Sequence, residues 1–223
     1  MISLKFVGIE EKFEAIPGKI YTLVLENPSI YYKYIRAFYL EDDETIIISK
    51  DGEILTQYSK YVLFIDNLFD LNPNSKKYLT SVYKQASSAY LNDSRKAKIS
   101  KIQDEINDLL DDVSLDFGYP MTFDRSFGLD KIMQTTSFCF SPDDQTNFFV
   151  SFVAYLKAVL EISKVKIVVT LDLFSVLNSD SVPLLKKELS LMGVCVVNIC
   201  PFDRKIKNYE KETTIIDSDY CEF

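Results

Sequence analysis

Short apolar runs alternate along this chain with longer amphipathic stretches, and the alternation predicts where strands and helices lie. Strands are predicted at 3–9, 12–16, 19–26, 44–49, 53–57, 61–66, 137–140, 164–171, 194–200 and 213–217. Helices are predicted at 28–40, 73–91, 94–113, 124–133, 143–162 and 181–192. Continuous apolar strands that alternate with helices favour an α/β fold with a mostly parallel, doubly wound sheet.

The region 70–134 differs from the rest of the chain because it is predicted to be entirely helical. Its helices 73–91 and 94–113 are separated by a short break, which favours an antiparallel hairpin. One stripe of the second helix is apolar and its other faces are charged; the stripe consists of Ile99, Ile102, Ile106, Leu109 and Leu110. We therefore expect a helical leg domain at 70–134, inserted into an α/β head domain formed by 1–69 and 135–223.

The composition is that of a globular protein, with 47% hydrophobic and 26% charged residues among 223. The first residues lack the basic and apolar layout of a signal peptide. No apolar run approaches the roughly 20 residues that cross a bilayer. We expect a cytoplasmic protein without a membrane partner.

The chain contains no histidine, which excludes Ser-His-Asp and Cys-His catalysis and every histidine general base. Its four cysteines form no CxxC pair, so a zinc site is not expected. Cys139 and Cys195 lie in apolar, strand-like runs and are expected to be buried, reduced thiols.

The junction between strand 19–26 and helix 28–40 is the place where nucleotide-binding α/β proteins carry a phosphate loop. Such a loop needs glycines for close approach of main-chain N–H groups, followed by a lysine and a hydroxyl. This chain has Glu26, Asn27, Pro28 and Ser29 there. Asn27 and Pro28 instead suit the capped start of a helix, so no nucleotide cofactor is expected.

Two acids follow or end apolar strands, where a metal-dependent nuclease or a degenerate ATPase would carry its carboxylates. These are Asp66 and Asp172. The alternative for both is an ordinary cap or a solvated turn.

Charge is unevenly distributed along the predicted leg. The densest acidic run comprises Asp104, Glu105, Asp108, Asp111, Asp112 and Asp116, which suits either a calcium site or a solvated helix face. Three basic groups stand out, at Arg95-Lys96-Lys98-Lys101, at Arg125 with Lys131, and at Arg204-Lys205-Lys207. The net charge of −8 argues mildly against a nucleic-acid partner, but a closed symmetric ring repeats a few cations around one axis and so builds a positive channel in an acidic protein.

Several short segments in order along nearly the whole chain resemble the small CRISPR-associated adaptation protein family of subtype II-A loci. They are 16–17, 22–27, 61–72, the helical pair, 115–117, 166–169, 181–193 and 215–220. The resemblance implies a degenerate P-loop NTPase-like head without a phosphate loop, joined to a helical leg. It also implies a non-catalytic, calcium-stabilised homotetrameric ring that binds the ends of linear double-stranded DNA without sequence preference. Its partners would be the CRISPR integrase and the type II effector nuclease, and its role would be spacer acquisition in antiviral defence.

Site residues follow from this resemblance and from local charge. Lys19 matches a basic residue of the family, whereas Arg95, Lys96, Lys98, Arg125 and Lys131 are expected to contact DNA from their charge and place in the leg. Residues 118–121 contain no acid where the family is rich in acids, which moves the expected calcium ligands to Asp111, Asp112 and Asp116. The alternatives are a metal-dependent nuclease or degenerate ATPase that uses Asp66 and Asp172, and a scaffold that binds only proteins.

Overall fold

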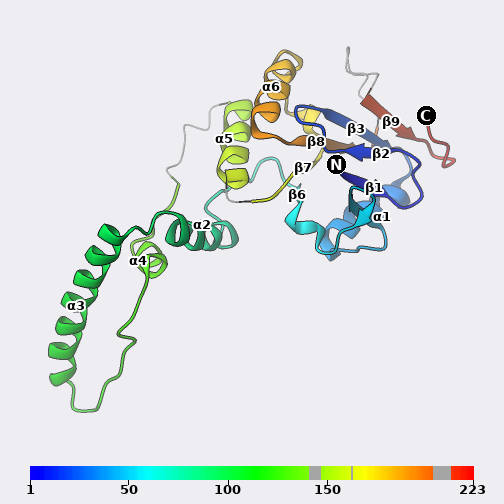
Figure 1. Ribbon diagram of the computed structural model, residues 1–223. Coiled ribbons are helices and arrows are strands. Elements are labelled where there is room, and N and C mark those ends of the chain that lie inside the picture. The colour runs from blue at the N-terminus through cyan, green and yellow to red at the C-terminus, as the bar shows by residue number, and fades with distance from the viewer. Residues whose placement is uncertain (141–146, 162, 203–211) are drawn as a thin grey trace. The chain divides into compact units, whose positions relative to one another are not determined.

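The computed structural model describes residues 1–140, 147–161, 163–202 and 212–223 of the chain. The chain divides into two compact units, which we call the head unit (Met1–Leu71 and Pro142–Phe223) and the helical unit (Asn72–Ser141). Figure 1 shows the strands within the head unit and α2, α3 and α4 within the helical unit. The domain borders expected from the sequence, at 69/70 and 134/135, remain a prediction.

The secondary structure follows the predicted alternation closely in the head unit. Its strands are β1 (Ile2–Phe6), β2 (Lys12–Glu14), β3 (Ile20–Leu25), β4 (Ile46–Lys50), β5 (Glu53–Ile54), β6 (Val62–Ile65), β7 (Ile167–Leu171), β8 (Cys195–Cys200) and β9 (Thr213–Ile216). Its helices are α1 (Pro28–Leu40), α5 (Phe148–Glu161) and α6 (Val182–Met192), with short 3-10 helices η1 (Tyr58–Lys60), η2 (Leu173–Ser175) and η3 (Ser179–Ser181). The helical unit contains α2 (Lys76–Ala89), α3 (Asp93–Leu115) and α4 (Leu129–Thr135).

A five-stranded parallel sheet in the order β6-β7-β8-β3-β9 forms the centre of the head unit. Strands β7, β8 and β3 are almost continuously buried, which is why their sequences show apolar runs rather than an alternating pattern. This sheet and the helices around it confirm the predicted α/β class with a parallel sheet and a helical region. Within the described residues, no helix combines the length and the apolar character needed to cross a bilayer.

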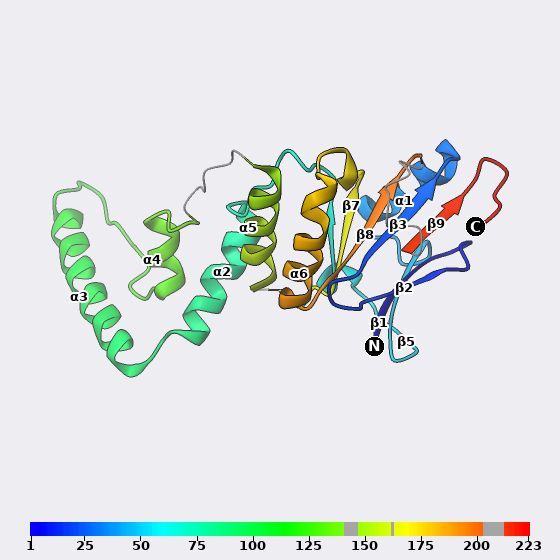
Figure 2. The ribbon, with the colours of Figure 1, turned by 90° about the horizontal axis from the view of Figure 1, so that it is seen from above.

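The two faces of the parallel sheet are covered by different elements. Tyr21, Leu23 and Leu25 of β3 belong to the core shared with α1 and with the antiparallel sheet β2-β1-β4-β5. Side chains alternate across a strand, so the buried Thr22 and Val24 face the other side of the sheet. There α5 and α6 lie side by side (Figure 2).

Phe6 on β1 joins the antiparallel sheet to α1. Its ring makes edge-to-face contacts with Phe13, Tyr34 and Phe38, at centroid distances of 5.8, 5.0 and 6.0 Å. Such pairs add specific geometry to the burial of large apolar side chains. The middle and the C-terminal half of α1 are therefore held by packing from the antiparallel sheet.

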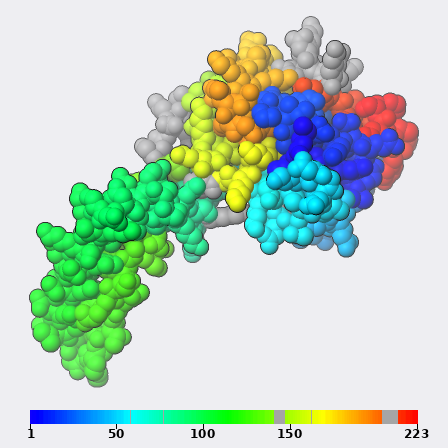
Figure 3. Space-filling model, viewed as in Figure 1, coloured from blue at the N-terminus to red at the C-terminus, as the bar shows by residue number. Residues whose placement is uncertain are grey.

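The predicted antiparallel hairpin of two long helices is wrong. Helix α2 packs on α4 instead, and no residue of α3 is buried. Figure 3 shows α3, in green, on the visible surface of the helical unit. The partner of α3 is the extended segment that returns from its C-terminus: Gln103 Nε2 donates to the carbonyl of Phe127, and Asn107 Nδ2 donates to that of Arg125 over 3.2 Å. An amphipathic pattern predicts a helix but does not say which neighbour covers it.

The predicted strand at 137–140 is also absent. The side-chain amide of Asn74 forms two hydrogen bonds with the main chain of Phe140. Its oxygen accepts from the N–H of Phe140 at 2.9 Å, and its nitrogen donates to the carbonyl of Phe140 at 3.0 Å. Tyr83 Oη donates to the carbonyl of Phe138 at 2.6 Å. Side chains rather than a neighbouring strand therefore satisfy this backbone. Cys139, which was predicted to be buried in a strand, is exposed in this segment outside the sheets.

Two helix starts differ from their predictions. The helix expected from 124 begins only at Leu129, because Asp124 accepts the N–H of Ser126 in a local turn and Gly128 stands as the N-cap. Helix α5 is described from Phe148, and the predicted start at 143 lies outside the described residues. The basic group at 204–207 also lies outside them.

Candidate nucleic-acid interface

The start of α1 occupies the place of a phosphate loop, and its main-chain donors are engaged within the chain. Asn27 Oδ1 accepts from the N–H groups of Ser29 and Ile30, at 2.9 and 3.4 Å. The Asn27 side chain also donates to the carbonyl of Ser218 over 3.1 Å, and Pro28 has no N–H to offer. This is an N-cap as the sequence predicted, and it leaves no cradle of N–H groups at this helix start.

Asp66 and Asp172 lie at the carboxyl ends of the neighbouring strands β6 and β7. Tyr39 Oη donates a 2.6 Å hydrogen bond to Asp66 Oδ2, and this bond, with burial as the smaller cause, raises the pKa of Tyr39 to about 12. Asp172 has a left-handed backbone and opens the 3-10 turn η2. Among the described residues, no three carboxylates or thiols gather closely enough to hold a metal ion. This geometry gives no support to the nuclease alternative.

Lys19 directly precedes β3 in the head unit. Its ammonium lies 4.3 Å from the centroid of the Tyr21 ring, and its side chain is half-buried. Burial is the first cause that raises the pKa of Tyr21, and that phenol donates to the carbonyl of Glu14 at 2.8 Å. Lys19 thus rests on an aromatic face.

The other expected DNA contacts belong to the helical unit, and three of them lie in the first two turns of α3. Arg95 Nη1 donates to the carbonyl of Tyr90 at 2.6 Å, and Lys96 lies 3.4 Å from Asp93 in an exposed pair. Lys98 is exposed and makes no ion pair with any residue that the structure describes. Lys131 lies on α4.

Arg125, the sixth expected contact, pairs with Asp111, an expected calcium ligand. Its Nη1 and Nη2 atoms lie 2.8 and 2.5 Å from the two carboxylate oxygens, and the guanidinium lies 4.6 Å from the Phe123 ring centroid. The hydrogen bond from Arg125 is the first cause that lowers the pKa of Asp111. Two groups with separate predicted roles therefore neutralise each other.

The other two expected calcium ligands do not complete a site around Asp111. Asp112 follows it on α3, where successive side chains point about 100° apart. Asp116 is the C-cap residue of this helix. Calcium takes six to eight oxygen ligands, and the three carboxylates form no such group in this geometry. Calcium binding by these residues remains a prediction.

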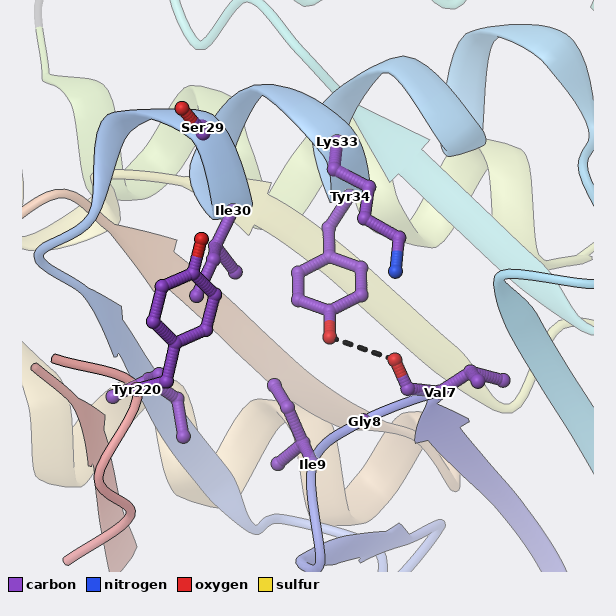
Figure 4. Close-up of a pocket in the computed structure, with 9 residues that line it drawn as sticks. Val7, Gly8, Ile9, Ser29, Ile30, Lys33, Tyr34 and Tyr220 are labelled. Atoms are coloured by element: carbon purple, nitrogen blue, oxygen red, sulfur yellow. Dashed lines mark hydrogen bonds between the residues drawn. The ribbon is translucent and has the colours of Figure 1, made fainter. Parts of the chain in front are cut away.

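A cavity of about 350 Å³ opens beside α1 in the head unit (Figure 4). Three distant segments line it: Val7 to Ile9, the first two turns of α1, and Ile216 with Tyr220. Tyr34 is buried at its edge and donates to the carbonyl of Val7 at 2.9 Å, and Lys33 supplies the one cation of the lining. A pocket of this size admits a small molecule but not a DNA duplex.

The apolar stripe on α3 is the feature whose role sequence reasoning missed. We expected it to pack within a helical hairpin, but Ile102, Ile106 and Leu109 are 40%, 37% and 61% exposed. Four of its residues and Val113 have the spacing 3-4-3-4 of a coiled-coil seam, and from here on the stripe means Ile99, Ile102, Ile106, Leu109 and Val113. Leu110 of the predicted stripe lies beside this seam. This spacing is visible in the sequence and was the signal available.

Comparison with known proteins places the chain among CRISPR-associated proteins. The model of the family described as CRISPR-associated protein (Cas_Csn2) matches residues 38–220. A search of curated proteins finds no match. Among solved structures, the crystal structure of Stu0660 of Streptococcus thermophilus is similar in fold, with a TM-score of 0.57 and 15% identity, over 97% of this chain and 74% of that chain.

Proposed function

Since this chain belongs to the Csn2 family of CRISPR-associated proteins, we propose that it binds the ends of linear double-stranded DNA as a homotetrameric ring. In this proposal the binding is independent of sequence, involves no catalysis and supports spacer acquisition in type II-A CRISPR immunity. The ring acts together with the CRISPR integrase and the type II effector nuclease. No nucleotide takes part, and the proposed binding does not depend on a bound calcium ion.

One observation carries the proposal: α3 is an exposed helix with opposite charges at its two ends. Residues 93–101 contain four cations and one acid, whereas residues 102–115 contain five acids and no cation. Contacts to DNA phosphates need only positive charge and reach, without a specific pocket. The exposed side chains of Arg95, Lys96 and Lys98 meet both requirements.

The apolar stripe supports self-assembly through the same helix. Five apolar side chains at heptad spacing on an exposed helix need a partner helix to cover them. Two parallel copies of α3 would align like charges, whereas two antiparallel copies bring the basic start of one against the acidic end of the other. The charge distribution therefore favours a second copy in antiparallel orientation. Arg95, Lys96 and Lys98 precede Ile99, the first residue of the stripe, so they are not part of the apolar seam itself.

Repetition around a ring also reconciles DNA binding with an acidic protein. The chain carries −8 at neutral pH, so a monomer would approach DNA against a repulsive field. Rotational symmetry brings the same few cations of each copy to one axis, where their fields add. With Lys19 and Lys131, each subunit offers five candidate contacts, whereas Arg125, the sixth cation expected to contact DNA, is paired with Asp111.

The experiment is a gel-shift comparison of linear and covalently closed forms of one plasmid, over a range of salt. We expect the linear form to bind preferentially, because a closed ring must thread onto an end, and we expect binding to weaken as salt rises. Equal binding of both forms contradicts a closed ring. Absence of any shift at low salt contradicts DNA binding and favours a scaffold that binds only proteins.

A charge reversal tests the residue assignment. Lys98→Glu changes one position per subunit and is repeated in every copy, so we expect strongly reduced binding and a shallower salt dependence. Each lost phosphate contact lowers the slope of log K against log salt by about 0.9. Lys5→Glu, at an exposed position on β1, makes the same change in net charge and is expected to retain most of the binding. Equal losses in both variants contradict the assignment of Lys98.

A further inference from the structure

Three polar residues of α3 hold the segment that returns from the end of this helix. Gln103, Asn107 and Asp111 are spaced by four residues, which places them along one side of the helix. Gln103 donates to the carbonyl of Phe127, Asn107 donates to the carbonyl of Arg125, and Asp111 accepts both hydrogen bonds of the Arg125 guanidinium. We call this row of contacts the polar ladder.

Apolar burial contributes little to holding the first part of this segment, residues 116–122. Phe117, Tyr119 and Met121 are 54%, 83% and 52% exposed, and every residue from 116 to 122 is exposed. The ion pair therefore closes the far end of the ladder on an otherwise open stretch of chain. Phe123 supports it, because its ring lies under the guanidinium.

The ladder ends where sequence resemblance placed a calcium site. Asp111 was expected to bind calcium with Asp112 and Asp116, but its two oxygens both accept from Arg125. The described carboxylates form no group that could hold a metal, and residues 118–121 contribute no acid. The residues present therefore do not fit the ion.

We propose that the Arg125 guanidinium supplies, from within the chain, the positive charge that a calcium ion would bring, and that it ties residues 123–127 to α3 without a metal. A guanidinium is suited to this role because its planar fork matches a carboxylate in bidentate geometry and its charge does not titrate. Arg125 then acts as a cross-link of the helical unit, and DNA contacts fall to the other cations.

The test is hydrogen–deuterium exchange of the full chain, read over residues 117–128, in calcium and in the presence of a chelator, without DNA. We expect the same protection in both conditions for the wild type. We expect Arg125→Gln and Asp111→Asn each to accelerate exchange in this segment by roughly two- to fivefold, as for the loss of a well-formed exposed ion pair. Asp112→Asn is the matched control, because it removes one negative charge from the residue next to Asp111. It should leave the exchange rate of residues 117–128 unchanged.

The exchanged pair Asp111→Arg with Arg125→Asp separates this ion pair from general effects of charge. We expect it to restore most of the protection that either single reversal removes. Protection in the wild type that requires calcium would overturn the proposal. Unchanged exchange in both Arg125→Gln and Asp111→Asn, with the parallel strands of the head unit protected as in the wild type, would overturn it as well.

The inference goes beyond the proposed function and fails separately from it. The exchange measurement contains no DNA, so its result does not depend on DNA binding. We also expect wild-type protein to retain DNA binding in a gel shift that contains a chelator. Loss of the shift on addition of the chelator would overturn metal independence. If wild-type protein shows no shift in any condition, the proposed function fails while the exchange data still decide the role of Arg125.

Discussion

Asn198, in the middle of the central strand β8, shows how one buried polar side chain fixes the turn after the neighbouring strand β7. It is fully buried, and its Oδ1 atom accepts from the N–H of Leu173 at 2.7 Å and from the Thr170 hydroxyl at 3.3 Å. The first of these bonds satisfies a buried main-chain donor just after β7, where Asp172 turns into a left-handed conformation. The side chain thus holds the turn that follows β7.

Replacing this side chain with an apolar one of similar size should destabilise the head unit. We expect Asn198→Leu to lower the free energy of unfolding by about 1–3 kcal/mol, because the buried N–H of Leu173 loses its acceptor. Thr170→Val is the control, since it removes only the longer bond and keeps the shape of the side chain. Urea denaturation measures both variants, and a wild-type midpoint for Asn198→Leu would show that the bond contributes nothing.

The Tyr39–Asp66 hydrogen bond makes the stability of the folded protein depend on pH in the alkaline range. The phenol has a pKa of about 12 in the folded chain against an ordinary value of 10.0, so the folded state holds this proton more tightly than the unfolded state. The resulting stability is complete below about pH 10 and is lost as pH rises towards 12. Burial raises the pKa of Tyr21 and Tyr34 in the same direction.

Tyr39→Phe should therefore reduce the loss of stability between about pH 10 and 12, compared with the wild type. In a spectrophotometric titration of the phenols, Asp66→Asn should shift one tyrosine from about 12 towards 10, because the acceptor has lost its charge. Exposed Tyr119→Phe is the matched control and should leave the alkaline loss unchanged. Identical alkaline profiles for wild type and Tyr39→Phe would contradict this assignment.

At the scale of elements, close approach between backbones sets the position of α6 against the turn before β3. Gly18 has a φ of +82°, and a Cβ atom there would lie 2.8 Å from the carbonyl oxygen of Lys186 and 3.0 Å from the Cβ of Ser190. Both residues belong to α6. The glycine allows the left-handed turn and the contact at the same time.

Gly18→Ala should lower the free energy of unfolding by about 1–3 kcal/mol, because the new methyl group forces a backbone to move. Gly118→Ala is the matched control, since its φ is not in the left-handed region and a Cβ there meets nothing within 4 Å. The melting temperature of each variant is the measurement. Equal melting temperatures for the two variants would show that α6 can shift to accommodate the methyl group without loss of stability.

At the scale of the whole molecule, the exposed helix α3 carries the features that a single chain leaves unused. Four residues of its apolar stripe, Ile102, Ile106, Leu109 and Val113, are exposed, and the two halves of the helix have opposite charge. Because a second copy in antiparallel orientation would satisfy both features, assembly and DNA binding are linked in the proposed function. A variant that loses assembly should then lose the combined field of the basic residues.

Ile106→Glu places a charge in the middle of the stripe and should dissociate the assembly, with loss of DNA binding at moderate salt. Gln85→Glu adds the same charge to an exposed position on α2, outside both the stripe and the basic start of α3, and should keep the oligomeric state. Light scattering coupled to size-exclusion chromatography gives the molar mass of each variant. An unchanged oligomer for Ile106→Glu would exclude α3 as the assembly interface.

The sequence by itself determined the α/β class, most helices and strands of the head unit, and the capped start of α1 at Asn27. These features depend on local hydrophobic periodicity and on residues near in the chain, which is why a single sequence reveals them. The family resemblance also came from the sequence, and a family match over residues 38–220 confirms it.

Only the tertiary structure decided which surfaces meet. It paired α2 with α4, replaced a predicted strand at 137–140 with bonds to Asn74, and joined Asp111 to Arg125. Periodicity identifies a face that needs a partner, but the choice among partners depends on hydrogen bonds and charges from distant segments. The roles of single acids and cations in the helical unit were therefore beyond the reach of local pattern.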